Sequence, residues 1–170
     1  MKIIMLVVAF CCLQSTHIFA QTTWTAGAYI VDFKIKNAGF TVNGSFKGLS
    51  ATLKFDEGGA NDYIEATIDA TTVDTNNGGR DKHLRKADFF DVQKHPTIKL
   101  KSVSFTKISA GKFKGSFKLT MKGITKTVEI PFTFNKGTFE GEVKLNRLDY
   151  GVGESSWVMS NDVTIHVKIN

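Results

Sequence analysis

The sequence has 170 residues, of which 42% are hydrophobic and 22% are charged. A chain of this length and composition folds most simply as one domain around a sizeable apolar core. Its formal net charge is +6, and its basic residues are spread along the chain instead of forming a patch with interleaved aromatic side chains. This distribution argues against nucleic acid as a partner and predicts a solvated, moderately basic surface.

The first twenty residues have the features of a secretory signal peptide. Lys2 supplies a positive start, and residues 3–13 form an apolar run that is too short to span a bilayer. Small and polar residues then lead to Ala20, so we expect cleavage before Gln21. The sequence therefore predicts an exported protein whose mature domain covers residues 21–170.

Both cysteines, Cys11 and Cys12, fall within this segment. Anchoring through a lipid on a cysteine is the alternative to cleavage and release, but Phe10 and Cys11 are larger than the residue that usually precedes a modified cysteine. Cleavage leaves a domain without disulfides or thiolate ligands, so its core alone must stabilise it. It also leaves 21 basic and 16 acidic residues. Attraction to an anionic membrane surface or head group therefore remains open.

About eight runs of alternating apolar and polar residues follow, the pattern of half-buried strands. They cover residues 29–36, 42–55, 64–71, 98–105, 112–121, 128–134, 139–145 and 163–169. The apolar phase flips between Gly48 and Leu49 and again between Leu100 and Val103, which indicates bulges that bend strands. Twelve of the fourteen phenylalanines belong to the mature domain. They suit an eight-stranded barrel with an apolar cavity or a packed sandwich core equally well.

A segment near residues 79–95 interrupts the alternation and predicts a short helical insertion. Gly78 and Gly79 permit the entry turn, Asp81 or these glycines would cap the helix, and Pro96 would end the segment. Phe89 and Phe90 are adjacent, so they cannot both face one narrow helix stripe. They would plug a barrel end or form the lip of a cavity.

The same segment offers the only obvious catalytic or metal-binding cluster. Its members are Arg80, Asp81, His83, Asp88, Asp91 and His95. Their spacing matches no standard zinc motif or nucleophile elbow, so we favour a structural role and expect no catalytic residue, metal or cofactor. Arg80 and Arg85 could instead face an anionic head group. Further along the chain, Arg147 and Asp149 could form an ion pair.

Three motifs together resemble the YceI family. The first runs from Val73-Asp74-Thr75 through Arg80-Asp81-Lys82-His83-Leu84 and Asp88-Phe89-Phe90-Asp91-Val92 to Pro96-Thr97-Ile98. The second covers residues 119–126, and the third is Asn146-Arg147-x-Asp149-Tyr150-Gly151-Val152-Gly153 with the final strand from Asp162. The likeness extends over nearly the whole mature chain.

The resemblance implies an antiparallel lipocalin-like barrel of eight strands in a bacterial periplasm. It implies a pore that holds a polyisoprenoid, such as an isoprenoid quinone or a polyprenyl phosphate, as a carrier or store. We expect the pore or its mouth to be lined by Phe33, Phe46, Phe89, Phe90, Phe105, Phe117, Phe132, Arg80 and His83. Two alternatives stay open: an enzyme that acts on a lipid head group through the Arg80–His95 cluster, and a secreted interaction domain with a filled core. The sequence leaves monomer and homodimer equally open.

Overall fold

The computed structural model describes residues 22–24, 29–55 and 62–170. The signal peptide predicted for residues 1–20 and its cleavage site lie outside this part of the chain. The strands are β1 (Thr22–Trp24), β2 (Tyr29–Asn37), β3 (Phe40–Ser45), β4 (Ser50–Lys54), β5 (Tyr63–Asp69), β6 (Thr97–Ser109), β7 (Lys112–Met121), β8 (Ile124–Asn135), β9 (Thr138–Asn146) and β10 (Met159–Ile169). The helices are α1 (Gly78–Leu84) and the 3₁₀ turns η1 (Ala70–Thr72) and η2 (Arg147–Tyr150). None of the helices in the described ranges has the length and apolar character that crossing a membrane requires.

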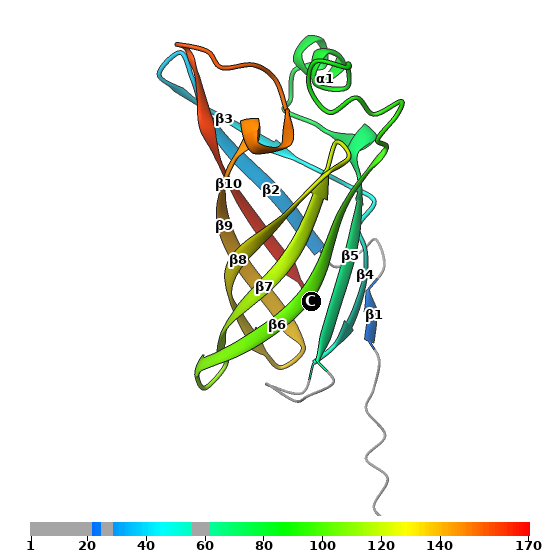
Figure 1. Cartoon of the computed structure of the whole chain (residues 1–170), viewed down its shortest axis with the longest axis vertical. Coiled ribbons are helices and arrows are strands. Elements are labelled where there is room, and N and C mark those ends of the chain that lie inside the picture. The colour runs from blue at the N-terminus through cyan, green and yellow to red at the C-terminus, as the bar shows by residue number, and fades with distance from the viewer. Residues whose placement is uncertain (1–21, 25–28, 56–61) are drawn as a thin grey trace, which may run out of the picture.

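All these strands belong to one antiparallel sheet that curls into a barrel (Figure 1). Its hydrogen-bonded order is β1-β4-β5-β6-β7-β8-β9-β10-β2-β3. β3 pairs with β2 at one end of this order, and β4 pairs with β5 near the other. Because β3 and β4 are joined only by residues 46–49, the chain itself connects the two ends of the sheet. Counting β3 and β4 as one bent strand, with β1 as a short addition to β4, gives the expected eight-stranded barrel.

Both predicted phase slips coincide with breaks in the ladders. The slip at Gly48 and Leu49 falls in the gap between β3 and β4, where Gly48 adopts a left-handed conformation with φ of +70°. The second slip is a register shift in the pairing of β6 with β7, between Ser102 and Ser104. An extra residue in one strand bends it and increases its twist, which helps the sheet to curl.

The insertion after η1 is helical only at its start, because α1 ends at Leu84 and turns follow up to residue 94. The cap is Asn77, whose side-chain oxygen accepts the Arg80 N–H at 3.0 Å. The sequence predicted Asp81 or the glycines as the cap, and this prediction is wrong. Asp81 lies inside the helix, where its buried carboxylate accepts hydrogen bonds from the N–H and hydroxyl of Thr75. A capping side chain must precede the first turn, and Asn77 does.

Aromatic rings fill the half of the barrel that lies away from α1. We call this cluster the aromatic plug; it consists of Phe55, Phe105, Phe113, Phe117, Phe132, Phe134 and Phe139. Phe132 stacks on Phe139 with centroids 4.8 Å apart, and Phe55 meets Phe113 edge-on at 4.9 Å. Edge-on and stacked pairs add to the burial of apolar surface, so the plug closes this end of the interior.

The packing of the plug can be tested at Gly115, because Phe117 lies directly over this glycine. A Cβ added there would come within 2.3 Å of the Phe117 ring, which is fully buried and has little room to move. We expect Gly115→Ala to lower the free energy of unfolding by about 1–3 kcal/mol through overpacking, as measured by urea denaturation. Gly78→Ala is the control, because no atom lies within 4 Å of its added Cβ. Equal stability of the two variants would contradict this account of the plug.

Candidate functional site

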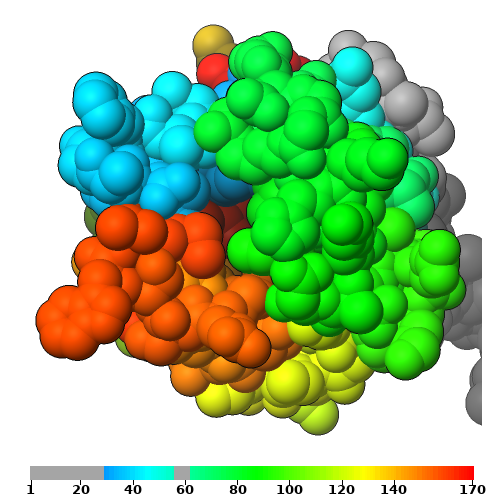
Figure 2. Space-filling view, turned by 90° about the horizontal axis from the view of Figure 1, so that it is seen from above, coloured from blue at the N-terminus to red at the C-terminus, as the bar shows by residue number. Residues whose placement is uncertain are grey.

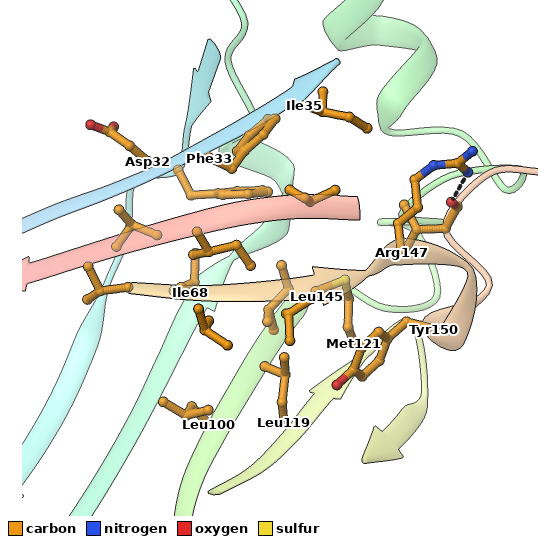
Figure 3. Close-up of a pocket in the computed structure, with 18 of the residues that line it drawn as sticks. Asp32, Phe33, Ile35, Ile68, Leu100, Leu119, Met121, Leu145, Arg147 and Tyr150 are labelled. Carbon is orange, nitrogen blue, oxygen red and sulfur yellow. Dashed lines mark hydrogen bonds between the residues drawn. The ribbon is translucent and has the colours of Figure 1, made fainter. Parts of the chain in front are cut away.

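An apolar cavity of about 200 Å³ lies between the aromatic plug and α1. Its wall is made by inward side chains of the barrel strands, among them Ile35, Ile68, Leu100, Leu119 and Leu145 (Figure 3). Almost all of the surface facing the cavity is apolar. Apolar cavities of about 150 Å³ stay dry and take up small apolar molecules, so this space is suited to a hydrocarbon rather than to water.

The cavity opens at the end that carries α1. Figure 2 looks onto this end and shows a hollow between three segments: the β2–β3 hairpin, the loop of residues 151–158 and the insertion of residues 78–95. We call these three segments the rim. The N–H of Ala38 donates to the carbonyl of Val158 at 2.6 Å, and the N–H of Gly153 donates to the carbonyl of Asp88 at 2.8 Å. The 151–158 loop is therefore bonded to both other parts of the rim.

Four of the phenylalanines that we expected at the pore do line the cavity: Phe33, Phe46, Phe89 and Phe90. Phe46 lies 5.4 Å from Phe33 and meets Phe90 edge-on at 5.5 Å, measured between ring centroids. The ring of Phe33 covers Gly44 so closely that a Cβ there would come within 2.2 Å of it. A wall of rings thus runs from β2 through the β3–β4 break to the insertion.

The other three, Phe105, Phe117 and Phe132, lie in the aromatic plug and not at the cavity wall. Phe117 has no exposed surface, and Phe132 is 4% exposed. Alternation along a strand shows that these rings point inward, but it does not show how far along the barrel axis they lie. Their contribution is to close the cavity from below.

The charged cluster of the insertion divides into separate local contacts. Arg80 borders the cavity, but its guanidinium donates to the hydroxyl of Thr75 at 2.7 Å and to the Thr75 carbonyl at 2.9 Å. His83 does not line the cavity and is exposed, with its Nε2 at 2.6 Å from an Asp88 carboxylate oxygen. The hydrogen bond with His83 lowers the pKa of Asp88. Within the described ranges, no three His, Cys, Asp or Glu side chains gather as a metal ion would require.

Arg147, at the start of η2, is a buried cation that holds the rim loop in place. Its guanidinium donates to the carbonyl oxygens of Val152 at 2.8 Å, Glu154 at 2.7 Å and Ser160 at 2.9 Å. The ion pair with Asp149 that the sequence allowed does not form; Asp149 contacts Lys126 at 3.2 Å instead. Burial lowers the pKa of Arg147, and the three carbonyl groups solvate its charge in place of water.

Tyr150, at the end of η2, lines the cavity and carries a buried, unpaired hydroxyl. The residue is 2% exposed and lines the cavity, and its ring runs beside Met121 with the oxygen pointing toward the side where Leu119 lies (Figure 3). Among the described residues, its hydroxyl is the one buried side-chain polar atom without a hydrogen-bond partner. Burial, with a smaller contribution from Asp149, raises the pKa of Tyr150, so the hydroxyl remains a donor at neutral pH.

Sequence reasoning missed the roles of Arg147 and Tyr150, although both stand in a motif that it singled out. The available signal was an arginine and a tyrosine directly after a strand, followed by Gly151, whose φ is +63°. Such a turn, placed directly after β9, can direct both side chains back into the barrel.

Comparison with known proteins places this barrel in a family. The model of the YceI-like domain matches residues 20–170. The chain belongs to the YceI family. It is 32% identical over 151 residues to Protein YceI of Escherichia coli O157:H7, covering 82% of this chain and 78% of that protein. It is 29% identical over 160 residues to UPF0312 protein VPA0850 of Vibrio parahaemolyticus serotype O3:K6, covering 85% and 83%.

Solved structures related to the YceI-family chain share its fold. BcnA of Burkholderia cenocepacia superimposes with a TM-score of 0.76 at 26% identity, covering 83% of this chain and 94% of BcnA. The YceI protein of Campylobacter jejuni gives 0.68 at 27% identity, covering 75% and 82%. A polyisoprenoid binding domain from Saccharophagus degradans gives 0.67, covering 86% and 95%. Its identity is 14%, so this last likeness shows the fold alone.

The role of Arg147 in this YceI-family barrel can be tested by Arg147→Met. The substitution keeps an apolar stem but leaves the carbonyls of the rim loop without their donor. We expect a loss of about 2–4 kcal/mol in the free energy of unfolding, measured by urea denaturation. Lys126→Met, which removes the exposed pair with Asp149, serves as the matched control and should cost less than about 1 kcal/mol. Similar losses in both variants would contradict a special role for Arg147.

Proposed function

We propose that this protein binds a polyisoprenoid, or a similarly long apolar chain, inside the barrel and serves as its carrier or store. The observation that carries the proposal is the apolar cavity, closed by the aromatic plug and open at the rim. The Saccharophagus degradans structure, which is described as a polyisoprenoid binding domain, has the same fold and supports this class of ligand. The cavity also favours a binding protein over an interaction domain with a filled core.

Such a ligand needs few polar contacts. Each Å² of apolar surface that it removes from water contributes roughly 25 cal/mol, so a tail that fills the cavity binds through burial alone. The strands hold the wall in place before the ligand arrives, which reduces the conformational entropy lost on binding. The cavity would take the first part of a tail, and the rest of a longer molecule would lie toward the rim.

The polar groups near the cavity favour a neutral head group over a phosphate. Arg80 and Arg147 both reach this region, but Thr75 and the rim carbonyls already accept their hydrogen bonds. A phosphate would need such donors for itself. The Tyr150 hydroxyl can donate one hydrogen bond to a carbonyl or ether oxygen. Between the two expected ligands, an isoprenoid quinone therefore fits better than a polyprenyl phosphate.

We favour a non-catalytic role. An enzyme that acts on a lipid head group would bring an acid, a base and an electrostatic stabiliser to one point. Here His83 is exposed and bound to Asp88, whereas Arg80 is held by Thr75, so the two do not converge. We also propose that the protein works outside the cytoplasm, in the periplasm of a bacterium and without a lipid anchor. This part rests on the signal-peptide features of residues 1–20.

Extraction of the purified exported protein with organic solvent, followed by mass spectrometry, tests the carrier function directly. We expect an isoprenoid lipid in the extract and a rise in melting temperature when it is added back, because a ligand that binds only the folded state stabilises it. An empty extract, together with no thermal shift from any isoprenoid, would overturn the proposal.

A variant that fills the cavity should lose isoprenoid binding. Ala66 lines the cavity from β5, so Ala66→Phe would occupy the space that a tail requires. We expect the variant to stay folded and to bind an isoprenoid at least about tenfold more weakly. Thr127→Phe places the same ring on the exposed side of β8 and should bind like the wild type. Equal binding by both variants would mean that the ligand occupies another site.

Tyr150→Phe tests the preference for a neutral head group. The substitution removes one hydroxyl and keeps the ring, so the cavity wall is preserved. We expect affinity for an isoprenoid quinone to fall about three- to tenfold, the effect of one hydrogen bond, with no change for an isoprenoid hydrocarbon such as squalene. Titration calorimetry or fluorescence can measure both ligands. An equal loss for both would show that the hydroxyl affects packing and not head-group recognition.

A further inference from the structure

Three large apolar side chains stand exposed on the rim. Phe40 is 77% exposed, Trp157 is fully exposed at 106%, and Val158 is 60% exposed. Phe40 begins β3 in the β2–β3 hairpin, and the other two end the loop that leads into β10. The hydrogen bond from the Ala38 N–H to the Val158 carbonyl holds the two segments together. We call Phe40, Trp157 and Val158 the rim triad.

The rim triad lies immediately beside the cavity along the chain. Asn37 and Val42, on either side of the hairpin turn, both line the cavity, as does Met159, which follows Val158. In Figure 1 the hairpin and the 151–158 loop project together above the barrel wall. Exposed apolar residues that are scattered singly need no explanation, but three on adjoining segments at the mouth of an apolar cavity mark a contact surface.

We propose that the rim triad docks this protein onto an anionic lipid bilayer, with the cavity mouth facing the membrane. Tryptophan and phenylalanine favour the membrane–water interface, where an aromatic ring meets both the head groups and the first part of the acyl region. In this orientation an apolar chain moves between bilayer and cavity without crossing water. The inference takes its cargo from the proposed function, but the docking itself needs no cargo.

Charge at this end of the molecule suits an anionic surface. Lys36 on β2 and Lys82 and Lys86 in the insertion are exposed, and each lysine near an anionic bilayer adds to the attraction. Three nearby carboxylates already have partners within the protein. Asp81 is buried against Thr75, Asp88 contacts His83, and Asp91 lies 3.9 Å from Lys94. Glu154 is an exposed acid on the rim loop and opposes the attraction. The net charge of +5 expected for the mature domain agrees with this partner.

Co-sedimentation with lipid vesicles tests the docking surface, using mature protein freed of ligand. The vesicles contain equal parts of phosphatidylethanolamine and phosphatidylglycerol, with phosphatidylcholine alone as the neutral comparison. We expect the wild type to bind the anionic vesicles, and Phe40→Ser combined with Trp157→Ser to reduce partitioning about tenfold or more. Trp157→Ser alone should give a smaller loss in the same direction, which keeps the test valid if the double variant folds poorly.

Ile108→Ser is the matched control. Ile108 is 63% exposed, but it lies near the end of β6, at the opposite end of the barrel from the rim (Figure 1). Its substitution should leave vesicle binding unchanged. The sequence has two tryptophans, so Trp24→Phe leaves Trp157 as the single fluorescent reporter. Its emission should move to shorter wavelength on anionic vesicles, and a soluble quencher should lose access to it.

Two results would overturn the inference: no vesicle binding by the wild type, or an equal loss in the rim and Ile108 variants. If vesicle binding is absent and the rim variants abolish self-association of the wild type, a second copy of the chain covers the triad instead. Isoprenoid binding measured in detergent micelles is a separate readout, so the proposed function can fail while docking holds, or the reverse.

Discussion

The structure depends on the way in which the chain closes its own sheet. Residues 40–54 pair with β2 at one end and with β5 at the other, so the crossing at residues 46–49 connects the two ends of the sheet through the chain itself. A sheet closed in this way has an enclosed interior, which its strands must line with apolar side chains. The crossing also delivers Phe46 to the ring wall beside Phe33 and Phe90. Closure and cavity are thus consequences of the same bent segment.

Alternation is a local property, so the sequence could predict the strands and their inward faces. The choice of a barrel over a sandwich came from the resemblance to the YceI family, because closure depends on pairing between distant strands. The phase slip at Gly48 and Leu49 already marked the bend, and the inward phase of each strand identified the side chains of the interior. Alternation carries no information about height along the barrel axis, so Phe33 at the cavity and Phe117 in the plug were indistinguishable. What separates them is tertiary packing: Phe117 is surrounded by other rings, whereas Phe33 has Gly44 beneath it and the cavity beside it.

The arginines illustrate a second limit of sequence reasoning. A cation near a proposed ligand site suggests an anionic ligand only if its donors are free. Arg80 directs its Nε and one of its Nη groups to Thr75, and Arg147 directs its guanidinium to carbonyl oxygens of the loop that shapes the mouth and of Ser160. Thr75 lies five residues before Arg80, and Ser160 lies 13 residues after Arg147. The Arg147 and Ser160 groups meet only when η2 and β10 fold back together. The two cations therefore build the rim, and the neutral cavity behind it selects against charge.

The wall and the mouth differ in how firmly they are held. Each strand of the wall belongs to ladders that must break together, whereas the rim loop is joined to its neighbours by the Ala38–Val158 and Gly153–Asp88 bonds and by Arg147. A single hydrogen bond contributes about 0.5–1.5 kcal/mol net, and local opening follows the least cooperative contacts. Opening of the rim therefore costs far less than opening of the wall. A ligand of the proposed kind would use this route, and the exposed aromatic side chains of the rim stand where it would enter and leave.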